Sequence, residues 1–95
     1  MSTSFSNLAI LIPTYNPNQN LYDLLIKVSS YQWNQIVVVN DGSSSINSNE
    51  LLDQIKDINN VNVINHPSNQ GKGSALKTGI EFLKNNENNI DGVIT

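Results

Sequence analysis

The sequence predicts a parallel α/β fold with the element order β-α-β-α-β-α-β. Two observations point to it. The strand candidates are short and apolar throughout, which is typical of strands covered on both faces of a sheet. Segments with apolar residues at helical spacing separate them, as right-handed crossover connections require. A chain of 95 residues has room for one small domain.

The first strand and helix are expected within residues 8–28. "LAILI" at Leu8–Ile12 is a continuous apolar run, and we expect the strand to end at Pro13 because proline has no N–H for a sheet ladder. Either Asn18 or Asn20 is a candidate cap for the helix that follows. The apolar face of this helix is expected to hold Leu21, Leu24, Leu25 and Val28.

The second strand is expected at "IVVV", Ile36–Val39, with Trp33 covering the edge of the core between the first helix and this strand. The loop "NDGSSSINS" follows. Asn47 and Glu50 are three residues apart and resemble a capping box, which predicts Asn47 as the cap of the second helix. The apolar residues of this helix are Leu51, Leu52, Ile55 and Ile58.

The third strand is expected at Val61–Asn65, followed by the loop "HPSNQGKG" and a third helix. Glycine costs a helix about 1 kcal/mol relative to alanine, so Gly79 on the apolar face predicts close packing against the sheet. A fourth strand begins in "DGVIT", where the chain ends at Thr95. We therefore expect residues 1–95 to be the N-terminal portion of one domain that continues beyond residue 95, inactive and poorly stable alone.

Composition excludes several classes of function. The net charge is −3 and no Lys/Arg cluster is present, which argues against a nucleic-acid partner. Because there is no cysteine, disulfides and thiolate metal sites are impossible. No apolar run approaches the roughly 18 residues of a membrane helix. We expect a cytoplasmic protein.

Ligands of open α/β sheets bind at the carboxyl ends of the strands, which directs attention to the loops "PTYNPN", "NDGSSS" and "HPSNQGKG". In the first loop, Pro13 and Thr14 precede Tyr15, whose ring stands where a nucleobase could stack. The alternative is an ordinary Pro/Asn turn with a half-buried tyrosine.

In the second loop, Asp41 directly follows a buried strand. Its carboxylate could accept the N–H of a nucleobase or the hydroxyls of a ribose. Gly42 would let the backbone approach a ligand, and Ser43 adds a hydroxyl. The alternative is a common Asp-Gly-Ser turn.

In the third loop, "GKGS" opens a helix, so free amide N–H groups and the side chain of Lys72 could face a phosphate. A Walker A loop is excluded because His66 stands where its first glycine is required. A dinucleotide fingerprint is matched only in part: Gly71 and Gly73 fit, but Leu76 replaces the third glycine and the loop follows the third strand, not the first. The alternative for Lys72 is a solvated lysine. For His66, the only histidine, we expect a capping or surface position.

In combination, "ILIPTYNP", "IVVVNDGSSS", "NQGKGSALKTGI" and "DGVIT" resemble the opening of the family 2 glycosyltransferases. The resemblance covers residues 8–95 and implies the GT-A fold, a Rossmann-like fold of nucleotide-diphospho-sugar transferases, here truncated. The Gly-Lys-Gly-x-Ala-Leu-Lys-x-Gly form is most similar to the dolichyl-phosphate-sugar synthase-like branch.

The resemblance implies a nucleotide-binding set made of Pro13, Thr14, Tyr15, Asp41, Gly42, Ser43 and Lys72. In this set Tyr15 would lie against the face of the base, and Asp41 would contact base and ribose. Asn40 stands where the family has the first aspartate of Asp-Asp-Gly-Ser. This departure removes a charge and keeps hydrogen-bonding capacity.

The resemblance also implies the activity: transfer of a hexosyl group from a nucleotide-sugar donor to a polyprenyl phosphate or a growing glycan, as in bacterial cell-envelope polysaccharide biosynthesis. It implies Mg²⁺ or Mn²⁺, with metal ligands and catalytic base beyond Thr95. Relatives with a membrane-embedded C-terminal part suggest the cytoplasmic face of a membrane as the location.

Two alternatives stay open. A sugar-nucleotide nucleotidylyltransferase has a related fold, but its glycine- and arginine-rich first loop is replaced by "PTYNPN". A degenerate, non-catalytic module that binds a nucleotide or a protein partner is the alternative from another class. An Asp-x-Asp motif after Thr95 would argue against such a module.

Overall fold

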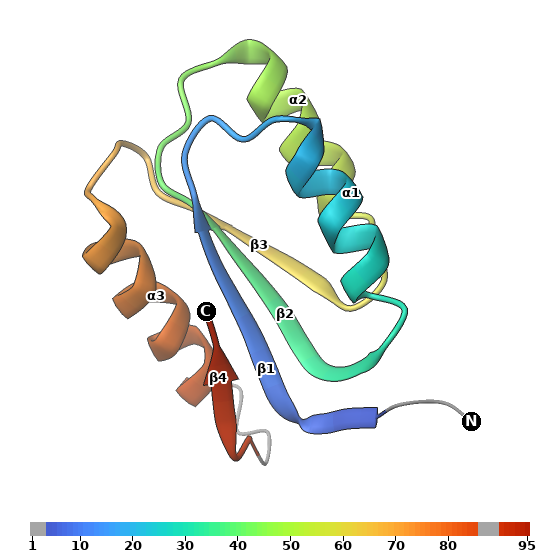
Figure 1. Cartoon of the computed structure of the whole chain (residues 1–95). Coiled ribbons are helices and arrows are strands. Elements are labelled where there is room, and N and C mark those ends of the chain that lie inside the picture. The colour runs from blue at the N-terminus through green and yellow to red at the C-terminus, as the bar shows by residue number, and fades with distance from the viewer. Residues whose placement is uncertain (1–3, 86–89) are drawn as a thin grey trace.

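The computed structural model describes residues 4–85 and 90–95. Its elements occur in the predicted order (Figure 1): β1 (Ser4–Thr14), α1 (Gln19–Val28), β2 (Gln32–Asn40), α2 (Ile46–Ile55), β3 (Val61–Asn65), α3 (Lys72–Asn85) and β4 (Gly92–Ile94). All strand pairings are parallel, and the sheet order is β3-β2-β1-β4. The α/β class and the parallel sheet of the prediction are confirmed.

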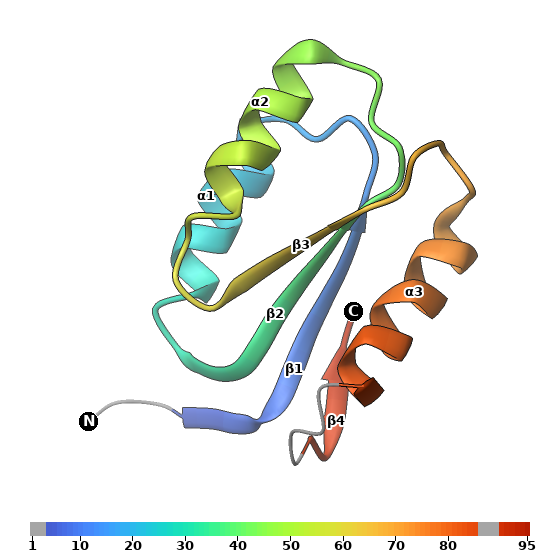
Figure 2. The same ribbon diagram turned by 180° about the vertical axis from the view of Figure 1, so that it is seen from behind.

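Helices cover both faces of this sheet. Figures 1 and 2 show α1 and α2 on one face and α3 on the other. Successive residues of β2 point to opposite faces: Ile36 and Val38 join the core under α1 and α2, whereas Val37 and Val39 join the core under α3. All four side chains are fully buried, which explains why the strand is apolar throughout instead of alternating.

Strand β1 runs one residue past the predicted end at Pro13. Pro13 pairs in register with Val39, and the Thr14 carbonyl accepts a hydrogen bond from the Asp41 N–H on the β2 side (2.8 Å). Because neighbouring residues of a strand point their backbone groups to opposite sides, Pro13 faces the other side. The missing N–H therefore interrupts no hydrogen bond between β1 and β2.

Of the two predicted helix caps, the cap of α1 is confirmed and the cap of α2 is wrong. Asn18 caps α1, with its side chain accepting from the Asn20 N–H at 3.0 Å. The predicted cap of α2 at Asn47 is wrong: Ser45 is the cap, and its hydroxyl accepts from the Ser48 N–H at 3.3 Å. Asn47 therefore lies inside the first turn of the helix.

Two packing predictions hold. Trp33 packs against the core under α1 and α2 and donates from its indole N–H to the Val28 carbonyl at 2.8 Å. Gly79 of α3 lies so close to β1 that an added Cβ would stand 2.1 Å from a methyl carbon of Leu11. The sheet and α3 therefore pack in close contact.

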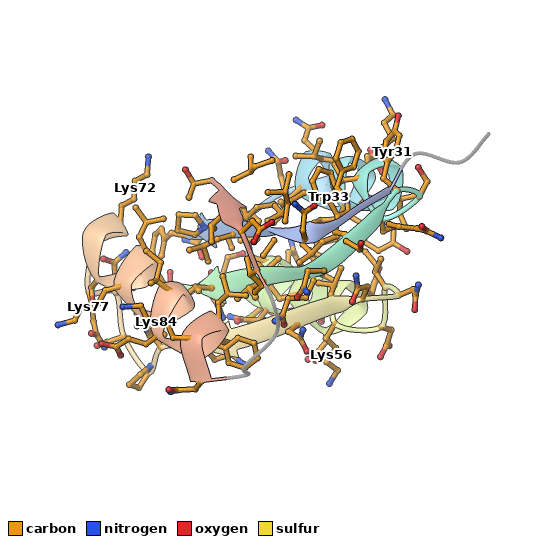
Figure 3. The ribbon with its side chains drawn as sticks, turned by 90° about the horizontal axis from the view of Figure 1, so that it is seen from below. Tyr31, Trp33, Lys56, Lys72, Lys77 and Lys84 are labelled. Carbon is orange, nitrogen blue, oxygen red and sulfur yellow. The ribbon has the colours of Figure 1, made fainter. Side chains whose placement is uncertain are left out.

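The two ends of the sheet differ in character. Figure 3 shows Trp33 and Tyr31 at one end and Lys72 at the other.

Lys27, Lys77 and Lys84 are exposed on helices, as expected. Of the helices in the described part of the chain, none has the length and apolarity needed to cross a membrane.

Candidate functional site

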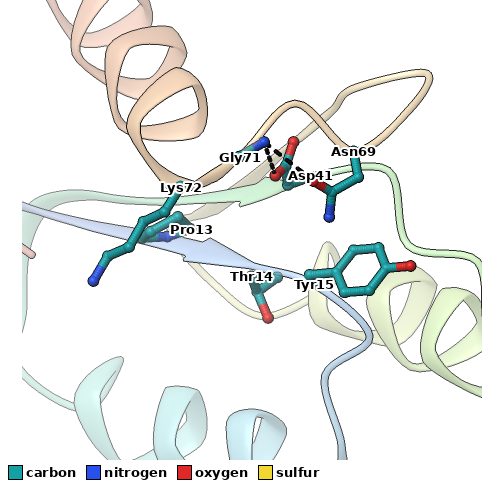
Figure 4. Close-up of a pocket in the computed structure, with 7 residues that line it drawn as sticks. All are labelled: Pro13, Thr14, Tyr15, Asp41, Asn69, Gly71 and Lys72. Atoms are coloured by element: carbon teal, nitrogen blue, oxygen red, sulfur yellow. Dashed lines mark hydrogen bonds between the residues drawn. The ribbon is translucent and has the colours of Figure 1, made fainter.

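A pocket of about 290 Å³ opens at the carboxyl ends of β1 and β2. Residues from three loops far apart in the sequence line it (Figure 4): Pro13, Thr14, Tyr15, Asp41, Asn69, Gly71 and Lys72. Five of the seven residues in the set implied by the resemblance thus lie around one pocket. The sheet order places β4 and β2 on opposite sides of β1, and such a switch point is where α/β sheets commonly bind ligands.

The other two residues of that set, Gly42 and Ser43, lie beside the pocket and not in its lining. Gly42 has φ +70°, and a Cβ added there would stand 2.2 Å from the Ser68 carbonyl carbon. Glycine is therefore required for contact with the β3–α3 loop. The Ser43 hydroxyl accepts from the Asn16 N–H at 2.9 Å, which ties the second loop to the first.

Asp41 is the buried charge of the site, with 4% of its surface exposed. Its Oδ1 accepts from the Gln70 N–H and from His66 Nδ1, and its Oδ2 accepts from the Gly71 N–H, all at 2.9 Å. The Gln70 N–H lowers the pKa of the Asp41 carboxyl most, followed by the hydrogen bond from His66. The group is therefore an ionised acceptor at neutral pH.

One acceptor position of Asp41 stays open. An ionised carboxylate offers about four lone-pair sites, and the three donors leave one of them, on Oδ2. Asp41 is among the residues that line the pocket. A ligand N–H or hydroxyl could donate to the open position. The carboxylate is thus held rigidly by the protein and still able to recognise a donor.

His66 is not the surface or capping residue that we expected. Its side chain is 9% exposed and lies between Asp41 and α3, with Nε2 2.8 Å from the hydroxyl of Thr78. The strand register contains the signal that would have found it. Asn40 and Asn65 are partners at the ends of β2 and β3, so the residues that follow them, Asp41 and His66, are neighbours.

Asn16 organises the first two loops and was also missed. Its Oδ1 accepts from the N–H groups of Ser44 and Ser45, at 2.9 and 3.0 Å. Its φ of +48° is a conformation that asparagine tolerates better than most residues. Next to it, the Tyr15 hydroxyl is 3.2 Å from Ser44 Oγ, and Tyr15 is 48% exposed. The loop therefore presents a held but accessible ring at the pocket.

The third loop contributes Asn69, which sequence reasoning did not single out, and Lys72. Asn69 Oδ1 accepts from the Gly71 N–H at 3.2 Å. Lys72 is the exposed first residue of α3. Figure 4 shows it beside Pro13, on the side of the pocket away from Tyr15. The pocket thus has an aromatic end and a cationic end.

Asn40 keeps its hydrogen-bonding capacity, as we expected of the residue that departs from the family pattern. It is 5% exposed. Its amide donates to Asn65 Oδ1 at 2.9 Å and its Oδ1 accepts from the Ser43 N–H at 3.0 Å. It therefore links β2, β3 and the second loop, outside the pocket lining.

The residues at the pocket do not fit a metal centre. Within residues 4–85 and 90–95, no group of three or more His, Cys, Asp and Glu side chains could hold a metal ion. The carboxylate at the pocket, Asp41, is already bound by three donors of the protein. We therefore assign no metal ligand among these residues.

Comparison with known proteins places this geometry in context. The model of the family described as "Glycosyl transferase family 2" matches residues 9–86, which include every residue discussed above for the pocket. A dolichyl-phosphate beta-glucosyltransferase of Trichomonas vaginalis is 32% identical over 83 residues, covering 76% of this chain and 25% of that protein.

A second relative is the poly-beta-1,6-N-acetyl-D-glucosamine synthase of Staphylococcus aureus strain COL, 34% identical over 76 residues, covering 78% of this chain and 18% of that protein. The chain therefore spans a quarter or less of the length of these relatives.

Proposed function

The chain belongs to glycosyl transferase family 2, and from this membership we propose that its pocket binds the nucleotide of a nucleotide-sugar donor in a glycosyltransferase. One observation carries the proposal. The residues that the family resemblance implies for the nucleotide, Pro13, Thr14, Tyr15, Asp41 and Lys72, come from three separate loops and line the same pocket.

Each end of the pocket suits a different part of a nucleotide. The accessible ring of Tyr15 offers a face for a base, and aromatic side chains stack on bases of any sequence. The open position on Asp41 Oδ2 can accept an N–H of the base or a ribose hydroxyl. Lys72 and the first amides of α3 supply positive charge for the diphosphate. In this proposal the residues of the pocket contact the base, the ribose and the diphosphate of a nucleotide-sugar.

The transferred group and its acceptor are part of the same proposal. We propose hexosyl transfer to a polyprenyl phosphate or to a growing glycan. One relative is named for dolichyl phosphate and another for a polymer of N-acetylglucosamine, so each acceptor class has a relative in support. In this proposal the reaction takes place in the cytoplasm, at the cytoplasmic face of a membrane, and Mg²⁺ or Mn²⁺ takes its ligands from outside residues 1–95.

Calorimetry on the full-length protein tests the nucleotide proposal. The probes are UDP, GDP, CDP, dTDP and ADP, each with magnesium chloride. We expect at least one to bind, and we expect Tyr15→Ala to weaken that binding about fivefold or more, because base–aromatic stacking contributes about 1–3 kcal/mol. Lys72→Ala should also weaken it by removing the cation.

Lys77→Ala is the matched control, since Lys77 is an exposed lysine of the same helix outside the pocket lining. Its affinity should equal that of the wild type. The proposal is wrong if none of the five nucleotides binds. It is equally wrong if one binds and the Tyr15 and Lys72 variants keep the wild-type affinity.

A further inference from the structure

His66 lies directly behind the pocket, although it does not line it. It is the residue that follows β3, and its N–H donates to the Asn40 carbonyl at 2.9 Å. Its Nδ1 is 2.9 Å from Asp41 Oδ1, and its Nε2 is 2.8 Å from Thr78 Oγ1. The ring therefore joins the buried carboxylate of the site to the middle of α3.

The chemistry of these contacts fixes the direction of one hydrogen bond. An ionised carboxylate only accepts, so the proton between the two groups is carried by His66 Nδ1. Since the other ring nitrogen is bound to the Thr78 hydroxyl and the side chain is 9% exposed, the ring is held at both ends. Buried networks in which every member is satisfied are rigid.

The orientation of Asp41 depends on this contact. The terminal torsion of aspartate is broad and only weakly restricted by its own covalent structure. The protein holds it through donors on both oxygens, and His66 supplies the one side-chain donor among them. Without that donor, each oxygen keeps one backbone hydrogen bond, from Gln70 to Oδ1 and from Gly71 to Oδ2. The carboxylate is then held less firmly, and the open position on Oδ2 is less well oriented.

We propose that His66 is a positioning residue for nucleotide binding, anchored by Thr78, which holds the Asp41 carboxylate so that its Oδ2 faces the pocket. The inference rests on the proposed function of the pocket and adds to it. His66 touches no ligand in this arrangement and acts through Asp41. Its removal should change nucleotide affinity more than it changes the stability of the fold.

Two isosteric substitutions separate the contacts of His66. In His66→Asn the amide nitrogen lies near the place of Nδ1, so the donor to Asp41 is kept and the contact with Thr78 is lost. In His66→Gln the longer side chain reaches toward Thr78 and leaves Asp41 without the donor. We expect His66→Gln to weaken binding of the nucleoside diphosphate about tenfold, as loss of a hydrogen bond to a charged group does. We expect His66→Asn to weaken it only about threefold, because it keeps the donor to Asp41 and loses the contact with Thr78.

A second pair keeps the histidine and tests its anchor. Thr78→Val removes the hydroxyl from a side chain of nearly the same shape, whereas Thr78→Ser keeps it. We expect Thr78→Val to weaken binding about threefold, since the ring keeps its contact with Asp41 but loses its anchor, and Thr78→Ser to bind like the wild type. This pair of variants tests the positioning role of His66 even where a His66 variant does not fold.

A double-mutant cycle identifies the route of the effect. If His66 acts through Asp41, the loss caused by His66→Gln should largely disappear in an Asp41→Asn background. Melting temperatures of all variants, measured without ligand, show whether affinity merely follows stability.

The outcomes separate the two proposals. If the wild type binds none of UDP, GDP, CDP, dTDP and ADP, both the pocket's function and the role of His66 are wrong. If the wild type binds and Asp41→Asn weakens binding, the pocket's function stands. Equal affinities of His66→Gln and His66→Asn, or a His66→Gln effect that persists in Asp41→Asn, would then overturn the positioning role alone.

Discussion

At the scale of single residues, the Asp41 carboxyl makes the stability of the fold depend on pH. Its pKa in the folded chain lies below the ordinary value of 3.8, chiefly because the Gln70 N–H binds the ionised form. The unfolded state therefore holds more protons near that value, and stability rises with pH there. The stabilisation is fully present above the ordinary pKa and is lost as the pH falls through the lower, folded pKa.

We expect the advantage in the free energy of unfolding of the wild type over Asp41→Asn to be constant at neutral pH and to shrink as the medium is acidified below about pH 5. Urea denaturation followed by circular dichroism, at a series of pH values from neutral to strongly acidic, measures it. A difference that stays the same throughout the series would show that the Asp41 hydrogen bonds do not favour the ionised carboxylate.

The backbone at Gly42 tolerates no side chain. Its φ is +70°, and a Cβ would stand 2.2 Å from the backbone of Ser68. We expect Gly42→Ala to destabilise the protein by about 2 kcal/mol or more, since the left-handed conformation alone costs a non-glycine residue about 1–3 kcal/mol and the clash with backbone atoms adds to it. Thermal and urea denaturation measure the loss.

Gly73→Ala is the control for this change. No atom lies within 4 Å of a Cβ added at Gly73, and the residue is in the first turn of α3, where alanine is the better helix former. We expect a neutral or slightly stabilising effect. Equal destabilisation by the two alanines would contradict the account of Gly42.

At the scale of elements, α3 is placed by its contact with β1. A Cβ added at Gly79 would stand 2.1 Å from Leu11 Cδ1, and Leu11 is fully buried. Alanine would add about 1 kcal/mol of helix propensity, but overpacking a dense core costs about 1–3 kcal/mol. We therefore expect Gly79→Ala to destabilise the protein by about 1 kcal/mol, measured by urea denaturation.

Shortening Leu11 tests the cause. In a Leu11→Val background the methyl carbon in the way is gone, so Gly79→Ala should become neutral or stabilising. If Gly79→Ala destabilised the Leu11→Val protein as much as the wild type, the contact between α3 and β1 would not be the cause of the destabilisation.

The accuracy of the predicted element boundaries depended on how many competing local signals the sequence contained. The apolar run of β3 had clear borders, and its predicted range is the observed one. For α2, Ser45 and Asn47 are both good caps, and local sequence could not choose between them. The structure favours Ser45, and a long-range contact adds to it: the Ser48 hydroxyl donates to the Pro17 carbonyl at 2.8 Å, which holds the start of α2 against the first loop.

At the scale of the whole molecule, the pocket follows from topology. Parallel strands β1, β2 and β3 end at the same edge of the sheet, so the loops after them meet. Pro13, Tyr15, Asp41 and Lys72 could be predicted because each lies at the end of a strand, follows a strand or opens a helix at that edge. The fold class was predictable for the same reason, from the alternation of apolar runs and helical stripes.

The supporting residues of the site could not be predicted in this way. His66 and Asp41 are 25 positions apart, and Asn16 and Ser44 are 28 apart. Their pairing depends on the register between strands and on the backbone conformation of the loops, which local patterns do not determine. Asn69 was missed because several polar residues share its loop, and its neighbours alone do not show which of them faces the pocket.

The most direct test of the pocket as a nucleotide site is a crystal structure of the full-length protein with the nucleoside diphosphate that binds best in calorimetry. We expect the base beside Tyr15, a donor of the base or ribose on Asp41 Oδ2, and the diphosphate toward Lys72. A nucleotide bound elsewhere, with the pocket between the loops of β1, β2 and β3 left empty, would contradict the account.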